Sequence, residues 1–202
     1  MGGKALLTFC MAALLSSGTV AQLKVPPFEI DLKGGVFYTS FLNDLVGEME
    51  YVYAAPIWSA GINFHISQRI ALGGYYSGSI GGNVTLRNDY NGNNIGSFPS
   101  AHQVYGVQLR FSAGRNSKVR PYILATIANY EMFIDHESYR IANSSLVYGG
   151  ALGLMLRLNN ALYLTLPEIA VRMRTEGFYF EDSMEPMAEI KVGISYNFSK
   201  RK

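Results

Sequence analysis

The sequence predicts an all-β fold: an eight-stranded antiparallel up-and-down transmembrane β-barrel. Three observations support this. Segments of alternating apolar and polar residues recur along the chain, no uninterrupted apolar stretch of 18 residues follows the N-terminal region, and the connections alternate between short and long. The chain also contains 14 Tyr and 11 Phe, aromatic residues that favour strands.

The first 21 residues have the features of a signal peptide. Lys4 precedes the apolar run Ala5–Leu15, and small residues lead to Ala21. The run is shorter than the roughly 20 residues that span a bilayer, so cleavage after Ala21 is favoured over a membrane anchor. We expect one exported barrel domain, residues 22–202, in the cell outer membrane. Cys10, the single cysteine, would leave with the signal peptide, so no disulfide or thiolate chemistry is expected.

Eight strands are expected in chain order. They cover residues 29–39, 57–67, 70–80, 102–113, 120–134, 146–158, 162–174 and 187–198. In the first two, the apolar face runs from Ile30 to Tyr38 and from Trp58 to Ile66, because successive strand side chains point to opposite faces. A tight turn at 68–69 leads into the third strand, and the fourth alternates clearly.

The later strands show three different patterns. The phase of 120–134 is ambiguous, because both of its faces are apolar. Leucines at alternate positions define 146–158, and Asn159-Asn160 predicts a two-residue hairpin turn. In 162–174, Leu166 and Glu168 share a parity, so we expect a bulge near Pro167 that exchanges the faces. The last strand, 187–198, alternates almost throughout.

The connections separate by length and by charge. Short ones are expected at 68–69, 114–119 and 159–160, and long ones at 40–56, 81–101, 135–145 and 175–186. The long connections carry ten acidic residues against two arginines, whereas the short turns and chain ends, including Arg120, carry eight basic residues. Short periplasmic turns and long extracellular loops are typical of a membrane barrel.

Aromatic residues predict two girdles at the membrane interfaces. One set is Phe64, Phe111, Tyr122, Tyr196 and Phe198, and the other is Tyr38, Trp58, Tyr76, Tyr105, Tyr130 and Tyr148.

The opposite strand faces predict a charged, side-chain-filled lumen. The residues expected there form a lumen charge network: Asp31, Lys33, His65, Arg110, Arg157, Glu168, Arg172, Glu189 and Lys191. An eight-stranded barrel has room inside only for side chains, and unpaired charges there would be costly. A paired plug is favoured over a proton relay or a gated pore.

The chain resembles the small eight-stranded outer-membrane barrels of the OmpA/OmpX-like group, and more closely the PorT-like outer membrane protein β-barrel families of Bacteroidota. The matching features are the signal peptide, the segment from Arg120 to Ala125, and the C-terminal segment from Ile194 to Phe198. The resemblance implies that the last strand, with Tyr196 and Phe198, is the insertion signal read by the barrel-insertion machinery.

The leading functional hypothesis is a non-enzymatic outer-membrane protein with a structural or interaction role through four long extracellular loops. Expected partners are outer-membrane lipid and lipopolysaccharide, the insertion machinery, and an extracellular or envelope protein; near-neutral charge argues against nucleic acid. The alternatives are a small pore or transport protein, a lipid-modifying barrel enzyme, and a secreted lipocalin-like barrel, which would need an apolar interior and a polar exterior.

Specific chemistry is weakly indicated. Residues His65 and Ser67 share a strand face and His136-Glu137-Ser138 are adjacent, but neither set matches a catalytic motif, so no catalytic residues are predicted. Three histidines and no mature cysteine make a transition-metal site improbable, and no cofactor is expected. Acidic outer loops could bind divalent cations. Asp182-Ser183-Met184 resembles a short O-glycosylation motif of Bacteroidota.

Overall fold

The computed structural model describes residues 27–43, 49–88, 93–113, 118–136, 139–175 and 184–198. They form nine strands: β1 (Phe28–Asn43), β2 (Met49–His65), β3 (Ile70–Ser79), β4 (Asn83–Asn88), β5 (Asn94–Ser112), β6 (Val119–His136), β7 (Tyr139–Arg157), β8 (Leu162–Thr175) and β9 (Met184–Phe198). The expected signal peptide lies outside the described residues. Within the described ranges, no helix is long and apolar enough to cross a bilayer.

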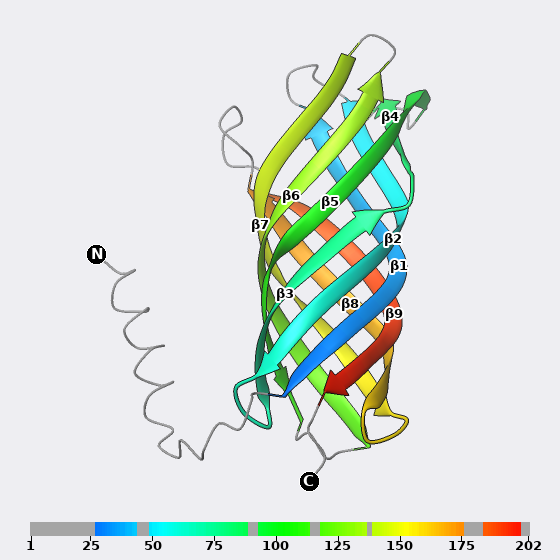
Figure 1. The fold of residues 1–202 in the computed structure, drawn as a ribbon. Coiled ribbons are helices and arrows are strands. Elements are labelled where there is room, and N and C mark those ends of the chain that lie inside the picture. Colours follow the sequence, from blue (N-terminus) through cyan, green and yellow to red (C-terminus); the bar gives the residue numbers. More distant parts are fainter. Residues whose placement is uncertain are drawn as a thin grey trace, which may run out of the picture.

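The sheet closes on itself to form a barrel (Figure 1). All strand pairs are antiparallel, and closure is completed by β1 and β9, which pair from Phe28 with Phe198 to Thr39 with Met187. Both β3 and β4 lie between β2 and β5, so they act as two halves of one strand of the wall. The nine segments therefore make the eight-stranded antiparallel barrel that the sequence predicted.

A β-bulge separates β3 from β4. Three residues, 80–82, lie between Ser79 and Asn83, opposite only two residues of β2. Gly81 and Gly82 have positive φ values of 75° and 156°, which glycine adopts without a steric penalty. The extra residue exchanges the faces: the inward side chain is odd-numbered at Ser77 and even-numbered at Val84.

The bulge expected near Pro167 is present in β8. Thr165 pairs with Gly193 and Glu168 pairs with Lys191, so two residues of β8 oppose one residue of β9. Inward positions change from odd numbers, as at Thr165, to even numbers from Glu168 onward. This change brings the charged part of β8 into the lumen.

Most of the residues expected in long connections are strand. β1 continues to Asn43, β2 begins at Met49, β5 begins at Asn94, and β6 and β7 extend to His136 and Tyr139. The prediction of loops over these residues was wrong. These extensions lack the apolar–polar alternation that marks the strands in the sequence, but the backbone ladder continues through them. The rest of the expected loops, with Asp182 and Ser183, lies outside the described residues.

Two of the short turns are wider than expected. Residues 158–161 separate β7 from β8, and the Asn159 side chain accepts hydrogen bonds from the backbone N–H groups of Ala161 and Leu162, both at 2.8 Å. Residues 66–69 separate β2 from β3, where the Ser67 hydroxyl accepts from the N–H groups of Arg69 and Ile70. Local side-chain acceptors of this kind are typical of turns.

The exterior of the wall is apolar and the interior is largely polar. Leu32, Val36, Ile127 and Leu152 are 52–62 % exposed on the outward face. In contrast, Tyr122 and Tyr130, which the sequence assigned to the aromatic girdles, point inward and are 3 % and 1 % exposed. Their even numbering in β6 resolves the ambiguous phase of that strand.

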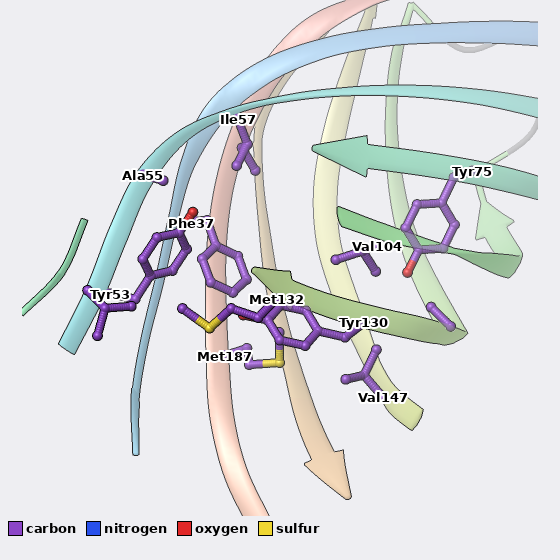
Figure 2. Packing of buried hydrophobic residues seen from close by; sticks show 12 residues of the cluster. Phe37, Tyr53, Ala55, Ile57, Tyr75, Val104, Tyr130, Met132, Val147 and Met187 are labelled. Carbon is purple, nitrogen blue, oxygen red and sulfur yellow. The ribbon is translucent and has the colours of Figure 1, made fainter. Parts of the chain in front are cut away.

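An apolar cluster, which the sequence did not predict, fills part of the interior. Figure 2 shows Phe37, Tyr53, Tyr130, Met132 and Met187 converging from different strands. The Phe37 and Tyr130 rings stack with centroids 6.1 Å apart. A second, smaller cluster contains Tyr122, Leu124, Ala151, Met155, Tyr163 and Ala170.

Candidate functional site

The candidate site is the polar interior of the barrel. Eight of the nine residues expected in the lumen have buried or nearly buried side chains there: Asp31, Lys33, His65, Arg110, Glu168, Arg172, Glu189 and Lys191. They come from β1, β2, β5, β8 and β9, which the closed topology places around one lumen.

One set of contacts forms a chain of alternating charge. Glu168 accepts from Lys33 at 2.6 Å through Oε2 and contacts Lys191 Nζ at 3.2 Å through Oε1. Lys191 Nζ also lies 2.6 Å from Glu189 Oε2, and the other oxygen of Glu189 pairs with Arg172. The Tyr122 hydroxyl donates to Glu168. Every carboxylate in this chain therefore contacts at least two donors.

A second set centres on Glu29. Its oxygens lie 2.6 Å from Arg110 Nη2 and 3.3 Å from His65 Nε2. Arg110 Nη1 is also 3.6 Å from Asp31, which accepts a 2.7 Å hydrogen bond from Asn63 Nδ2. The buried charges of these two sets are thus paired, which offsets the cost of removing them from water.

Two further arginines lie inside, and sequence reasoning missed both. Arg120, which was assigned to a basic rim, is fully buried; its Nη2 donates to Ser112 Oγ at 3.1 Å and its guanidinium lies over the Tyr163 ring. Arg174 is 7 % exposed and lies over the Tyr130 ring. Arg174 has the same even numbering as Arg172 in β8, and this shared strand face was the signal in the sequence that Arg174 also points into the lumen. Arg157, the ninth predicted residue, is half-buried at the end of β7 and donates to Asn160 Oδ1.

Glycines provide the space for the longest lumen side chains. Lys33 is the cross-strand neighbour of Gly193, Lys191 of Gly35, and Arg172 of Gly149. A Cβ atom added at Gly193 would lie 2.6 Å from Lys33 Cα and 2.8 Å from Lys33 Cγ. The same close approach occurs at Gly149, where an added Cβ would lie 2.6 Å from Arg172 Cα. At all three glycines the atom nearest to an added Cβ is a backbone oxygen of the neighbouring strand, at 2.0–2.3 Å, so the strands approach too closely there for any other residue.

The arrangement fills the lumen at this level. A cavity lined by Asp31, Lys33, Glu168, Arg172 and Lys191 has a volume of only about 20 Å³. That is space for about one water molecule. Chemically, the site is suited to fixing strands relative to one another by charge-assisted hydrogen bonds.

The residues weighed for catalysis have other contacts. His65 is buried against Glu29, whereas Ser67 is exposed and its hydroxyl organises the turn before β3. The side chains of 136–138 lie outside the described residues. Across the described ranges, no group of three or more His, Cys, Asp or Glu side chains is placed to hold a metal ion.

The C-terminal aromatic residues lie on the outward face of β9. Tyr196 and Phe198 are 44 % and 42 % exposed, with ring centroids 4.6 Å apart, and Phe198 stacks on Phe28. Their role as an insertion signal stays a prediction.

Comparison with known proteins identifies the fold. No family model and no curated protein matches the chain. Among solved structures, Neisserial surface protein A has a TM-score of 0.59 at 14 % identity, covering 85 % of this chain and 97 % of that one. OprG from Pseudomonas aeruginosa has a TM-score of 0.59 at 12 % identity, covering 88 % and 98 %. The N-terminal β-barrel domain of OprF from Pseudomonas aeruginosa has a TM-score of 0.54 at 13 % identity, covering 86 % and 98 %.

These likenesses agree with the expected OmpA/OmpX-like architecture, and the closer PorT-like resemblance stays a prediction. This chain has the fold of the small eight-stranded outer-membrane barrels.

Proposed function

We propose that this protein is an integral outer-membrane barrel without enzymatic activity, with a structural or interaction role at the end of the barrel opposite Phe28 and Phe198. The observation that carries the proposal is that the strands continue as a paired wall beyond the apolar part of the exterior. In this orientation the short turns, the start of β1 at Phe28 and the end of β9 at Phe198 face the periplasm.

The transition is clearest on β6. Its outward residues Ile123 and Ile127 are apolar and more than half exposed, but the next two outward residues are Asn129 and Glu131. Glu131 accepts hydrogen bonds from Gln103, from Tyr105 at 2.7 Å and from Asn129 at 3.0 Å. We call Gln103, Tyr105, Asn129 and Glu131 the outer polar belt. A hydrogen-bonded carboxylate here fits an interface with water and not a hydrocarbon layer.

Paired strands extend beyond this belt. β6 and β7 remain paired from Met132 with Asn143 to His136 with Tyr139, and Figure 1 shows these two strands rising past the ends of β8 and β9. Seven of the acidic residues counted in the long connections lie in the sequence between the strands: Asp44, Glu48, Asp89, Glu137, Glu176, Glu181 and Asp182. A stiff wall that carries acidic segments is suited to presenting them to a cationic partner, or to divalent ions shared with lipopolysaccharide phosphates.

The alternatives receive less support. A lipocalin-like soluble barrel would require an apolar interior and a polar exterior, whereas the exterior here is apolar and the interior contains paired charges. The paired charges and the apolar cluster occupy the space that a pore would need.

Pull-down from native outer membranes after mild cross-linking tests the proposal. One variant replaces Asp44, Glu48, Asp89, Glu181 and Asp182 with Asn or Gln, and a matched variant replaces Arg115, Lys118, Lys200, Arg201 and Lys202 with Gln. We expect the first variant to lose a partner that the intact protein and the second variant both retain. Equal recovery by all three would contradict an interaction role for the acidic end.

A further inference from the structure

A groove of about 780 Å³ lies on the outward face of the barrel, at the end that carries the short turns. One row of its lining residues consists of cross-strand neighbours: Phe111 of β5 pairs with Ile123 of β6, which pairs with Leu152 of β7. Pro121 and Leu154, which also pair, form the next row. The groove is therefore apolar along its length.

The bulge in β8 explains why the wall is hollow at this point. β7 pairs with β8 at Leu152 and again at Met155, so Gly153 and Leu154 lack a registered partner beside Pro167. Proline also lacks the N–H group that a ladder requires. Gly153 has no side chain, and the Tyr122 ring lies behind it, since an added Cβ would be 2.5 Å from Tyr122 Cζ.

The positively charged side chain of Arg69 lies at one end of the groove. Arg69 lines it, and the backbone there is held from two sides: the Arg69 carbonyl accepts from the Ser112 N–H at 2.8 Å, and its N–H donates to Ser67 Oγ at 3.2 Å. The Arg69 side chain is exposed. In the part of the chain that the structure describes, no carboxylate lies within ion-pair distance of it.

We propose that this groove binds a diacyl glycerophospholipid, with an acyl chain against Phe111, Leu152 and Leu154 and the phosphate at Arg69. The guanidinium matches a phosphate oxygen in charge and geometry, while the apolar walls match the acyl chain. Phospholipid is chosen over lipopolysaccharide because the groove is at the end of the barrel where β1 begins and β9 ends. That choice rests on the orientation in the proposed function.

Tryptophan fluorescence tests the site directly in the purified barrel. Trp58 is the single tryptophan, so the Trp58→Phe variant has no tryptophan fluorescence of its own. Leu154→Trp then places a reporter in the groove, and Val36→Trp places one on the outward face of β1, away from it. Both are reconstituted in phosphatidylcholine vesicles that contain brominated phosphatidylglycerol. We expect the groove reporter to be half-quenched at an about threefold lower mole fraction, the size expected of one exposed ion pair.

Two charge variants show what anchors the lipid. Arg69→Gln should remove the difference between the reporters, whereas Lys118→Gln, an exposed cation on the same end that does not line the groove, should leave it intact. Native mass spectrometry of the protein with its natural sequence should show one retained phospholipid, lost in Arg69→Gln.

Three results would overturn the assignment: equal quenching of the two reporters, a preference that survives Arg69→Gln, or equally effective competition by lipopolysaccharide. None of these measurements involves a partner of the acidic end, so they are independent of the proposed interaction role.

Discussion

Glu168 joins two lysines in the lumen network and also receives the Tyr122 hydrogen bond. Glu168→Gln keeps the shape but leaves buried ammonium charge without its partner. We expect unfolding free energy to fall by about 3 kcal/mol. Urea titration in detergent micelles measures this. Arg157→Gln, at the half-exposed end of β7, is the control and should change stability by less than about 0.5 kcal/mol. Equal losses in both variants would contradict a cooperative network.

At the residue scale, alternation was enough to predict which strand face most lumen residues occupy. It placed Asp31, Lys33 and Glu189 correctly because their strands have one apolar and one polar face. It failed for Arg120 and Tyr122, since both faces of β6 are apolar and the phase depends on pairing with β5 and β7. The apolar cluster around Phe37 was missed because an apolar inward residue leaves no contrast along the sequence.

The bulge in β8 gives a prediction about a single element. The bulge contains one residue more than its partner strand, so deleting Pro167 leaves Thr165 and Glu168 both facing inward with regular pairing. We expect this variant to fold. Deleting Ile169 instead turns Glu168 toward the exterior, if the rest of β8 keeps its register, at a cost of several kcal/mol.

Heat-modifiable gel mobility separates the two outcomes, because a folded barrel migrates differently from the unfolded chain. Loss of the folded form in both deletions would show that the bulge itself is needed for assembly.

The sequence predicted all eight strands of the wall but not their full length. The strand extensions such as 94–100 and 139–145 contain Asn, Ser, Gly and Pro, which gives them the composition of loops. The break between β3 and β4 was likewise included in an expected loop, because Gly81 and Gly82 have the sequence signature of a turn. Both errors arise where pairing with neighbouring strands decides the structure.

For the whole molecule, the lumen is occupied by two separate groups of side chains, the charge network and the apolar cluster, and both predict low conductance. Arg110→Met should disrupt the charge network without opening a path, because the cluster of Phe37, Tyr130 and Met187 remains. Phe37→Ala combined with Tyr130→Ala should also fail to open one while the ion pairs persist. Planar-bilayer recording checks both, and we expect larger conductance only when the changes are combined. A large conductance in Arg110→Met, at unchanged stability, would contradict a filled lumen.

The glycines opposite the lumen lysines limit how such a barrel can diverge. Lys33 and Gly193 are far apart in sequence but are cross-strand neighbours, as are Lys191 and Gly35. A Cβ atom at either glycine would meet the backbone of the partner strand, with Leu32 O 2.1 Å from a Cβ at Gly193 and Ile190 O 2.0 Å from a Cβ at Gly35. A smaller residue in place of the lysine would not relieve that contact. The pairing of β1 with β9 that closes the barrel therefore depends on glycine at positions 35 and 193, so closure itself fixes one residue near each end of the barrel sequence.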